Sequence, residues 1–127
     1  MYDIKNKSVG CIHAGWRGAF NGIIENTIKK FRKLNSNNEI FASVGPCKKF
    51  ISKSKKNIAY FVKKDNNKKL FNLRKYVNDK LVSLNAKVDH VNHDTFKEEK
   101  SFFSYRRSQK LQEKDYGRCI SIISIIS

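Results

Sequence analysis

The sequence has little of what a cross-linked, secreted or membrane-spanning protein carries. Its three cysteines, Cys11, Cys47 and Cys119, are an odd number in strand-like or mixed contexts and do not read as a disulfide framework. No apolar run approaches the ~18–20 residues that span a bilayer. No apolar segment follows the start Met-Tyr-Asp-Ile-Lys, as one would in a signal peptide. These absences predict a soluble chain, and we expect it to be cytoplasmic.

Arginine is scarce for so basic a chain. The net charge is +16, yet only six of the 27 basic residues are arginine, and the lysines are spread along the sequence. Specific nucleic-acid modules rely on arginine for paired contacts and on aromatic residues placed for stacking. We therefore interpret most of the charge as solvated surface and do not expect nucleic acid as the main partner. Polyanion binding and attraction to a phosphate-bearing small substrate stay open as alternatives.

The remaining pattern predicts an α/β fold. With 127 residues, the chain is one globular unit or a piece of one. Apolar spacing predicts a helix of roughly four turns over residues 20–34 and a second helix over residues 73–84. Short apolar runs predict strands at 8–13, 40–44, 70–73, 88–91, 102–105 and 120–126, while 58–62 fits a short helix or a strand. Strands that alternate with helices are typical of α/β organisation.

The segment His13-Ala-Gly-Trp-Arg-Gly18 is the first candidate site. A histidine ends a predicted strand, and Gly15 and Gly18 permit close approach of the backbone. Arg17 offers a planar fork for phosphate or carboxylate, the N-terminus of the following helix can hold an anion, and Trp16 can wall a pocket or stack on a base. The alternative is a tight strand-to-helix turn with a packed tryptophan.

Three weaker candidates follow. Arg106, Arg107 and Arg118 can converge on an anion if the strand at 102–105 pairs with the segment that follows Gly117. The alternative is an edge strand with solvated arginines. His90 and His93 would point to opposite faces of a strand, so we do not expect a metal there. Cys47 is interpreted as a small buried residue rather than a nucleophile.

The stretch Val9-Gly-Cys-Ile-His-Ala-Gly-Trp-Arg-Gly18 resembles the signature of the laccase-domain family. These proteins were formerly called multicopper polyphenol oxidases and are now described as purine nucleoside phosphorylases. The resemblance extends to Val44-Gly-Pro46, to the helix that begins at Phe71-Asn-Leu, and to Phe102-Phe-Ser-Tyr-Arg-Arg107 with Gly117-Arg118. Two such motifs in the family's order identify residues 1–127 as the C-terminal part of a single laccase-like domain.

The resemblance implies an incomplete, mixed-sheet αββα layered fold and a zinc site, with copper in the older description. The implied reaction is phosphorolysis of adenosine, inosine and methylthioadenosine to a free base and ribose 1-phosphate, with adenosine deamination alongside. His13 takes the role of a metal ligand. From their charge we assign Arg17 and Arg106 as catalytic, and Arg107 and Arg118 as substrate-binding. Trp16 is assigned as substrate-binding because its ring can wall a pocket or stack on a base.

The sequence also departs from the family pattern. The family's other two metal ligands, a histidine and a cysteine, fall before Met1 in the alignment, so His13 is the one ligand that this chain supplies. A short segment is missing after Pro46, and Asp94 replaces a common cysteine. We expect an apolar surface toward an N-terminal half, at Ile4, Val9, Cys11 and residues 120–126. The alternative function is an inactive fragment, or a basic binding module that needs a partner chain or RNA.

Overall fold

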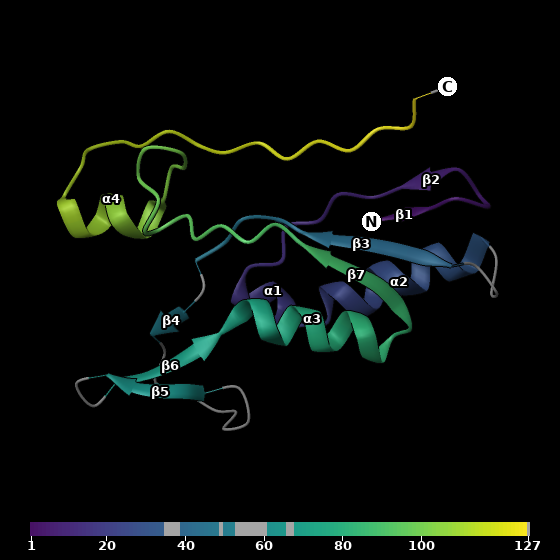
Figure 1. The fold of residues 1–127 in the computed structure, drawn as a ribbon, viewed down its shortest axis with the longest axis horizontal. Coiled ribbons are helices and arrows are strands. Elements are labelled where there is room, and N and C mark those ends of the chain that lie inside the picture. The colour runs from purple at the N-terminus through teal and green to yellow at the C-terminus, as the bar shows by residue number, and fades with distance from the viewer. Residues whose placement is uncertain (35–38, 49, 53–60, 66–67, 127) are drawn as a thin grey trace.

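The computed structural model describes residues 1–34, 39–48, 50–52, 61–65 and 68–126 (Figure 1). The elements follow one another in the order β1 (Tyr2–Asp3), β2 (Ser8–Val9), α1 (Trp16–Phe20), α2 (Ile23–Leu34), β3 (Ile40–Val44), β4 (Phe50–Ser52), β5 (Phe61–Asp65), β6 (Lys68–Asn72), α3 (Leu73–Ser83), β7 (Ala86–His90) and α4 (Tyr105–Leu111). This alternation confirms the predicted α/β class. Residues 58–60 of the ambiguous 58–62 segment lie outside the described residues, and its last two belong to β5.

A mixed four-stranded sheet with the order β2-β1-β3-β7 forms the frame of the fold. β1 pairs antiparallel with β2 and with β3, whereas β3 and β7 pair in parallel from Ile40–Ala86 to Val44–His90. The β1–β2 ladder continues for one more pair: the nitrogen of Met1 donates to the oxygen of Gly10, and the nitrogen of Gly10 donates to the oxygen of Met1, each at 2.9 Å. A separate sheet has the order β4-β6-β5.

Helices α2 and α3 cover one face of the four-stranded sheet (Figure 1). Ile24, Ile28 and Phe31 recur at helical spacing, so they form one buried stripe of α2. The stripe belongs to a core that also contains apolar residues of α3 and of the covered sheet face: Leu73, Val77, Leu81, Ile40, Ala42 and Ala86. An ion pair between Lys80 Nζ and Glu25 Oε1, at 2.9 Å, also links the two helices.

No helix in the described part of the chain covers the opposite face of the sheet (Figure 1). Side chains alternate between the two faces of a strand, so Tyr2, Phe41 and Lys87, which share one register row, lie on this second face. The Tyr2 and Phe41 rings stack with centroids 5.0 Å apart, and Lys87 Nζ lies 5.1 Å from the Phe41 centroid. Tyr2 and its row neighbour Val9 keep 40% and 37% of their surface exposed. We call this surface the open sheet face.

The single helix expected over residues 20–34 is two helices. α1 begins four residues earlier than predicted, and the chain turns at Asn21 and Gly22 before α2 begins. Gly22 has a φ of +82°, a left-handed conformation that a residue with a Cβ adopts only with strain. Periodicity missed the break because Phe20 and Ile23 both still pack against the core.

Two predicted strands are wrong. Residues 102–104 have no regular structure, and Tyr105 begins α4, because the Ser104 side chain accepts a hydrogen bond from the Arg107 N–H at 3.4 Å and caps the helix. Residues 120–126 form no strand and are largely exposed. Their isoleucines do favour strands, but no strand among the described residues is paired with them.

The other predicted elements are confirmed with shifted ends. The strand at 40–44 is β3, and the helix at 73–84 is α3. The strands at 70–73 and 88–91 correspond to β6 and β7, while only Ser8–Val9 of the strand at 8–13 is regular. Asn72, the last residue of β6, is also the N-cap of α3, because its side chain accepts a hydrogen bond from the Lys75 N–H at 3.0 Å.

Candidate functional site

Residues 10–15 connect β2 to α1 and place His13 at the surface. The His13 ring is exposed and lies against Gly15: a Cβ added there would be 3.4 Å from His13 Nε2. A Cβ at Gly18 would approach the His13 carbonyl oxygen at 3.8 Å. The histidine ring thus lies in ordinary contact distance of the turn that follows it. The helix after the turn, α1, has only five residues, so its N-terminus alone is a weak basis for the anion site that the sequence left open.

A cavity of about 830 Å³ opens beside this segment. One wall is residues 10–15 with His13, and a second is formed by the sheet, including Tyr2 and Phe41 of the open sheet face. Residues 45–47, Arg74 and residues 121–123 also line it. His13 thus lines a space large enough for a nucleoside-sized ligand.

Arg74 also lines this cavity, although nothing in the sequence identified it as a candidate site residue. Its guanidinium donates to Asn92 Oδ1 at 2.7 Å and to the His93 carbonyl oxygen at 2.5 Å. Its Nε is buried with no hydrogen-bond partner in the described part of the chain. The apolar spacing of α3 identifies the residues that it buries. It carries no signal for an arginine beside the cavity.

Trp16 and Arg17 lie behind the cavity rather than in its wall. Trp16 is partly buried against the core and meets Phe20 edge-on, with ring centroids 6.3 Å apart. Arg17 is exposed, and its guanidinium carbon lies 5.4 Å from the Trp16 ring centroid. Among the described residues, no carboxylate forms an ion pair with Arg17. The tryptophan therefore packs as the structural alternative predicted, while the Arg17 cation remains available to an anion.

The three C-terminal arginines have different environments. Arg107 donates to three carbonyl oxygens, those of Thr95 at 2.8 Å, Phe96 at 3.2 Å and Phe102 at 2.5 Å. Arg118 is exposed, and its Nη2 lies 3.9 Å from Asp115 Oδ1. The strand pairing that would have joined these arginines does not form, because Arg107 lies on α4.

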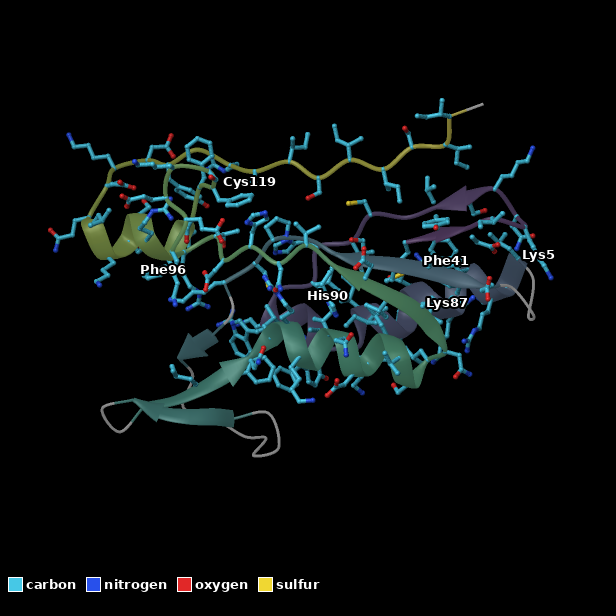
Figure 2. All side chains as sticks on the ribbon, viewed as in Figure 1. Lys5, Phe41, Lys87, His90, Phe96 and Cys119 are labelled. Carbon is cyan, nitrogen blue, oxygen red and sulfur yellow. The ribbon has the colours of Figure 1, made fainter. Side chains whose placement is uncertain are left out.

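Arg106 belongs to a cluster of cations around Lys48. Burial, and then the charges of Arg106 and Lys110, lower the pKa of Lys48, and Asp94 opposes them. The Lys48 ammonium lies 3.6 Å from the centroid of the Phe96 ring, which is labelled in Figure 2. Phe96 and Asp94 thus both stabilise the charge of Lys48, which the neighbouring cations repel. The cations of this cluster outnumber its carboxylate, and the excess positive charge is suited to an anion.

The remaining histidines and cysteines do not assemble a metal centre. His93 Nδ1 lies 2.7 Å from Glu98 Oε2, and His90 Nε2, at the end of β7, lies 3.0 Å from Asn78 Oδ1 (Figure 2). The Asp94 N–H, and then the His93 ring, hold the pKa of Glu98 below its ordinary value. Cys47 lines the cavity as a free thiol. In the described ranges, no three His, Cys, Asp or Glu residues come together as metal ligands.

Known proteins resemble this chain at two levels, a family model and individual curated relatives. Residues 1–126 match the family described as multi-copper polyphenol oxidoreductase laccase. The chain is 31% identical to a purine nucleoside phosphorylase of Rickettsia conorii over 92% of its own length, and 29% identical to one of Rickettsia prowazekii over 94%. It is 31% identical to a purine nucleoside phosphorylase of Haemophilus influenzae over 91%. No solved structure matches the chain.

These matches cover 55%, 55% and 51% of the three relatives, so the chain spans about half the length of the curated relatives it matches. None of the helices in the described part of the chain has the length and apolar character to cross a membrane. The family match extends over almost the whole sequence, from the hairpin through the His13 segment to the C-terminal isoleucines. The chain therefore belongs to the multi-copper polyphenol oxidoreductase laccase family.

Proposed function

We propose that this chain is the C-terminal part of a single laccase-like domain and contributes to a cytoplasmic purine nucleoside phosphorylase. The observation that carries the proposal is that His13, in the motif that resembles the family signature, lines the 830 Å³ cavity. The curated relatives are named purine nucleoside phosphorylases, which supports the reaction class. The proposed substrates are adenosine, inosine and methylthioadenosine with phosphate, with adenosine deamination as a second activity.

Phosphorolysis requires the enzyme to bring a phosphate anion to the sugar. A phosphate oxygen forms a bond to C1′ while the bond from C1′ to the purine nitrogen breaks, and the electron pair and a proton end on the base. Cationic side chains lower the barrier when they hold the phosphate in line with that bond. In the proposal Arg17 and Arg106 have this role, since neither guanidinium forms an ion pair among the described residues.

The other assigned residues act on the substrate or on its surroundings. Trp16 lies outside the cavity lining, and its proposed role in substrate binding depends on its contact with the Arg17 guanidinium. Arg118 is exposed and can bind an anionic group from its extended segment. Arg107 would contribute to substrate binding chiefly by holding the loop over residues 95–102, because its donors already face three carbonyl oxygens.

The family description names copper, and our proposed cofactor is zinc with His13 as one ligand. A catalytic zinc takes three protein ligands and one open position, and would lower the pKa of a bound water. Cys11, His13, Cys47 and Asp89 all line the cavity, but no three potential ligands come together among the described residues. The chain alone therefore does not fit the metal, and the remaining ligands must come from the part of the relatives that it does not cover.

The test is hypoxanthine release from inosine and phosphate, measured for the chain alone and for the chain mixed with the uncovered residues of the Rickettsia conorii relative. We expect the chain alone to release no hypoxanthine and to hold no EDTA-removable zinc. We expect the mixture to release hypoxanthine and to hold zinc that EDTA removes. His13→Ala and Arg17→Ala should abolish release by the mixture. His90→Ala is the matched control, because His90 does not line the cavity.

Two outcomes would contradict the proposal. The first is hypoxanthine release by the pure chain, or a stoichiometric zinc in it that His13→Ala removes. The second is release by the mixture that neither variant reduces.

A basic binding module is the second candidate function. The observation that favours it is the net charge of +16. Clustered cations such as Lys48 and Arg106 would then bind RNA phosphates or an acidic partner chain rather than a nucleoside.

A further inference from the structure

Three cations meet between the segment that follows β3 and the helix α4. Arg106 and Lys110 are four residues apart on α4, so they lie on the same face of that helix. Their charges both act on Lys48, whose side chain is half-buried against them. We call Lys48, Arg106 and Lys110 the Lys48 cluster.

The Lys48 cluster has little compensating negative charge. Asp94 is the carboxylate whose charge favours the protonated form of Lys48, and one of its oxygens already accepts a hydrogen bond from the Phe96 N–H at 2.9 Å. In the part of the chain that the structure describes, no carboxylate forms an ion pair with any member of the cluster. The cluster therefore keeps an excess of positive charge.

Backbone contacts hold the cluster in place. The Cys47 N–H donates to the His93 carbonyl oxygen at 3.4 Å, which fixes the residue before Lys48. The Arg107 guanidinium donates to the Phe96 carbonyl oxygen at 3.2 Å and so joins α4 to the residue whose ring lies under the Lys48 ammonium. Cations that are positioned before a ligand arrives lose less conformational entropy when they bind it.

The chemistry of the cluster suits a small phosphate group better than a nucleic acid. A phosphate group carries a charge of about −1.5 to −2 near pH 7. The Arg106 guanidinium can bind two of its oxygens, while the two lysines act as point charges. Proteins that bind single-stranded nucleic acids also present rings on which bases stack. The ring in this cluster, Phe96, is partly buried, and the Lys48 ammonium lies over it.

We propose that Lys48, Arg106 and Lys110 form a binding site for a phosphate group, supplied as inorganic phosphate or as a phosphate ester. The site lies beside the 830 Å³ cavity, because residues 45–47 line the cavity and Lys48 follows them directly. None of the three cations lines the cavity itself, so a phosphate here leaves that space free for a nucleoside. The inference rests on the proposed function in its assignment of Arg106 to phosphate, and it adds the two lysines.

The experiment measures binding to the complete 127-residue chain alone, without zinc and without the uncovered part of the relatives. The ligands are inorganic phosphate, adenosine 5′-monophosphate as the phosphate ester, adenosine as the same compound without phosphate, and a single-stranded RNA. All titrations are made at one ionic strength and followed by nuclear magnetic resonance. The titrations give each dissociation constant, and the side-chain signals of Lys48 and Arg106 show where the ligand binds.

Matched variants separate the site from the general charge of the chain. Lys48→Gln and Lys110→Gln each remove one charge from the cluster, whereas Lys48→Arg keeps it. Lys5→Gln is the control, because Lys5 is exposed in the turn between β1 and β2, at the other end of the molecule from Phe96 (Figure 2). Lys110 is exposed on α4, so its substitution leaves the core intact. Circular dichroism checks that each variant is folded.

We expect saturable binding of inorganic phosphate or of adenosine 5′-monophosphate that shifts the Lys48 and Arg106 signals, and no such shift with adenosine. Lys48→Gln and Lys110→Gln should each weaken this binding at least about threefold, and Lys48→Arg and Lys5→Gln less than about twofold. The tighter of the two phosphate compounds identifies the source of the group. The proposal is wrong if neither compound binds, if neither glutamine variant weakens binding, or if RNA alone binds.

Failure of this inference and failure of the proposed function give different results. Phosphate binding to the cluster, with no hypoxanthine release by the mixture, would contradict the proposed function and leave the site standing. Hypoxanthine release by the mixture, with no phosphate binding to the cluster, would contradict the site and leave the proposed function standing.

Discussion

Arg106 and Arg107 are neighbours in the sequence but have different functions in the fold. The Arg107 guanidinium joins α4 to the preceding loop through the carbonyl oxygens of Thr95, Phe96 and Phe102. Arg106 contributes its charge to the environment of Lys48. Of these two adjacent residues, Arg107 therefore has a structural role, whereas Arg106 is available to a ligand.

Arg107→Ala should lower the free energy of unfolding by about 1–3 kcal/mol, because three hydrogen bonds from a charged donor are lost. Arg106→Ala is the matched control and should change stability by less than about 0.5 kcal/mol. Urea denaturation of both variants provides the measurement. Equal losses of stability would show that the carbonyl contacts of Arg107 contribute nothing specific.

At the residue scale the sequence predicted neither the backbone around His13 nor the environment of the arginines. His13 was expected at the end of a strand over residues 8–13, whereas that strand ends at Val9 and His13 lies in the irregular connection to α1. The carbonyl partners of Arg107 and the cavity position of Arg74 depend on loops that fold back over helices. Spacing along the chain carries no information on such contacts.

Among the elements, the turn between α1 and α2 depends most on one residue. Gly22 adopts a φ of +82°, and the Asn26 N–H donates to its carbonyl oxygen at 2.9 Å to begin α2. Gly45, by contrast, has a negative φ and open space around the position of a Cβ. A Cβ at Gly22 would also have room, since it would lie 3.8 Å from Glu25 Oε2. Comparison of the two glycines therefore isolates the effect of the backbone conformation at Gly22.

Gly22→Ala should destabilise the chain by about 1–2 kcal/mol, because an L-residue is strained in the left-handed region. The same substitution at Gly45 should cost nothing measurable. Thermal unfolding monitored by circular dichroism of the two variants checks this difference. An unchanged midpoint for Gly22→Ala would mean that the α1–α2 turn relaxes without cost.

Elements with apolar periodicity were predicted, and those defined by caps or partners were not. The stripe of Ile24, Ile28 and Phe31 identified α2, and Leu73, Val77 and Leu81 identified α3. Ser104 reverses the prediction for residues 102–105, because a capping hydroxyl outweighs the strand preference of two phenylalanines. Residues 120–126 have strand preference, but a strand also requires a neighbouring strand to pair with. The composition of a segment does not show whether such a neighbour is present.

For the whole molecule, the excess of lysine predicts weak and salt-sensitive contact with nucleic acid. We expect RNA affinity to fall by a factor on the order of 10³ between about 50 and about 200 mM KCl, as counterion release requires. His13→Ala should leave that affinity unchanged, because His13 is not part of a cationic cluster. Fluorescence anisotropy with a single-stranded RNA gives both values. Micromolar binding that persists at physiological salt would favour the basic module over the phosphorylase.

The hydrogen-bonded pair between Met1 and Gly10 has a topological consequence. The bond to the Gly10 carbonyl oxygen uses one N–H of the Met1 amine, whose pKa is lowered by burial. An amide N–H at the same position would donate equally well, and a preceding residue would simply prolong β1. The hairpin therefore has the same geometry in a free chain and in a longer polypeptide. Because β1 lies between β2 and β3, a covalent connection at this end would leave along the axis of β1 without breaking a bond of the fold.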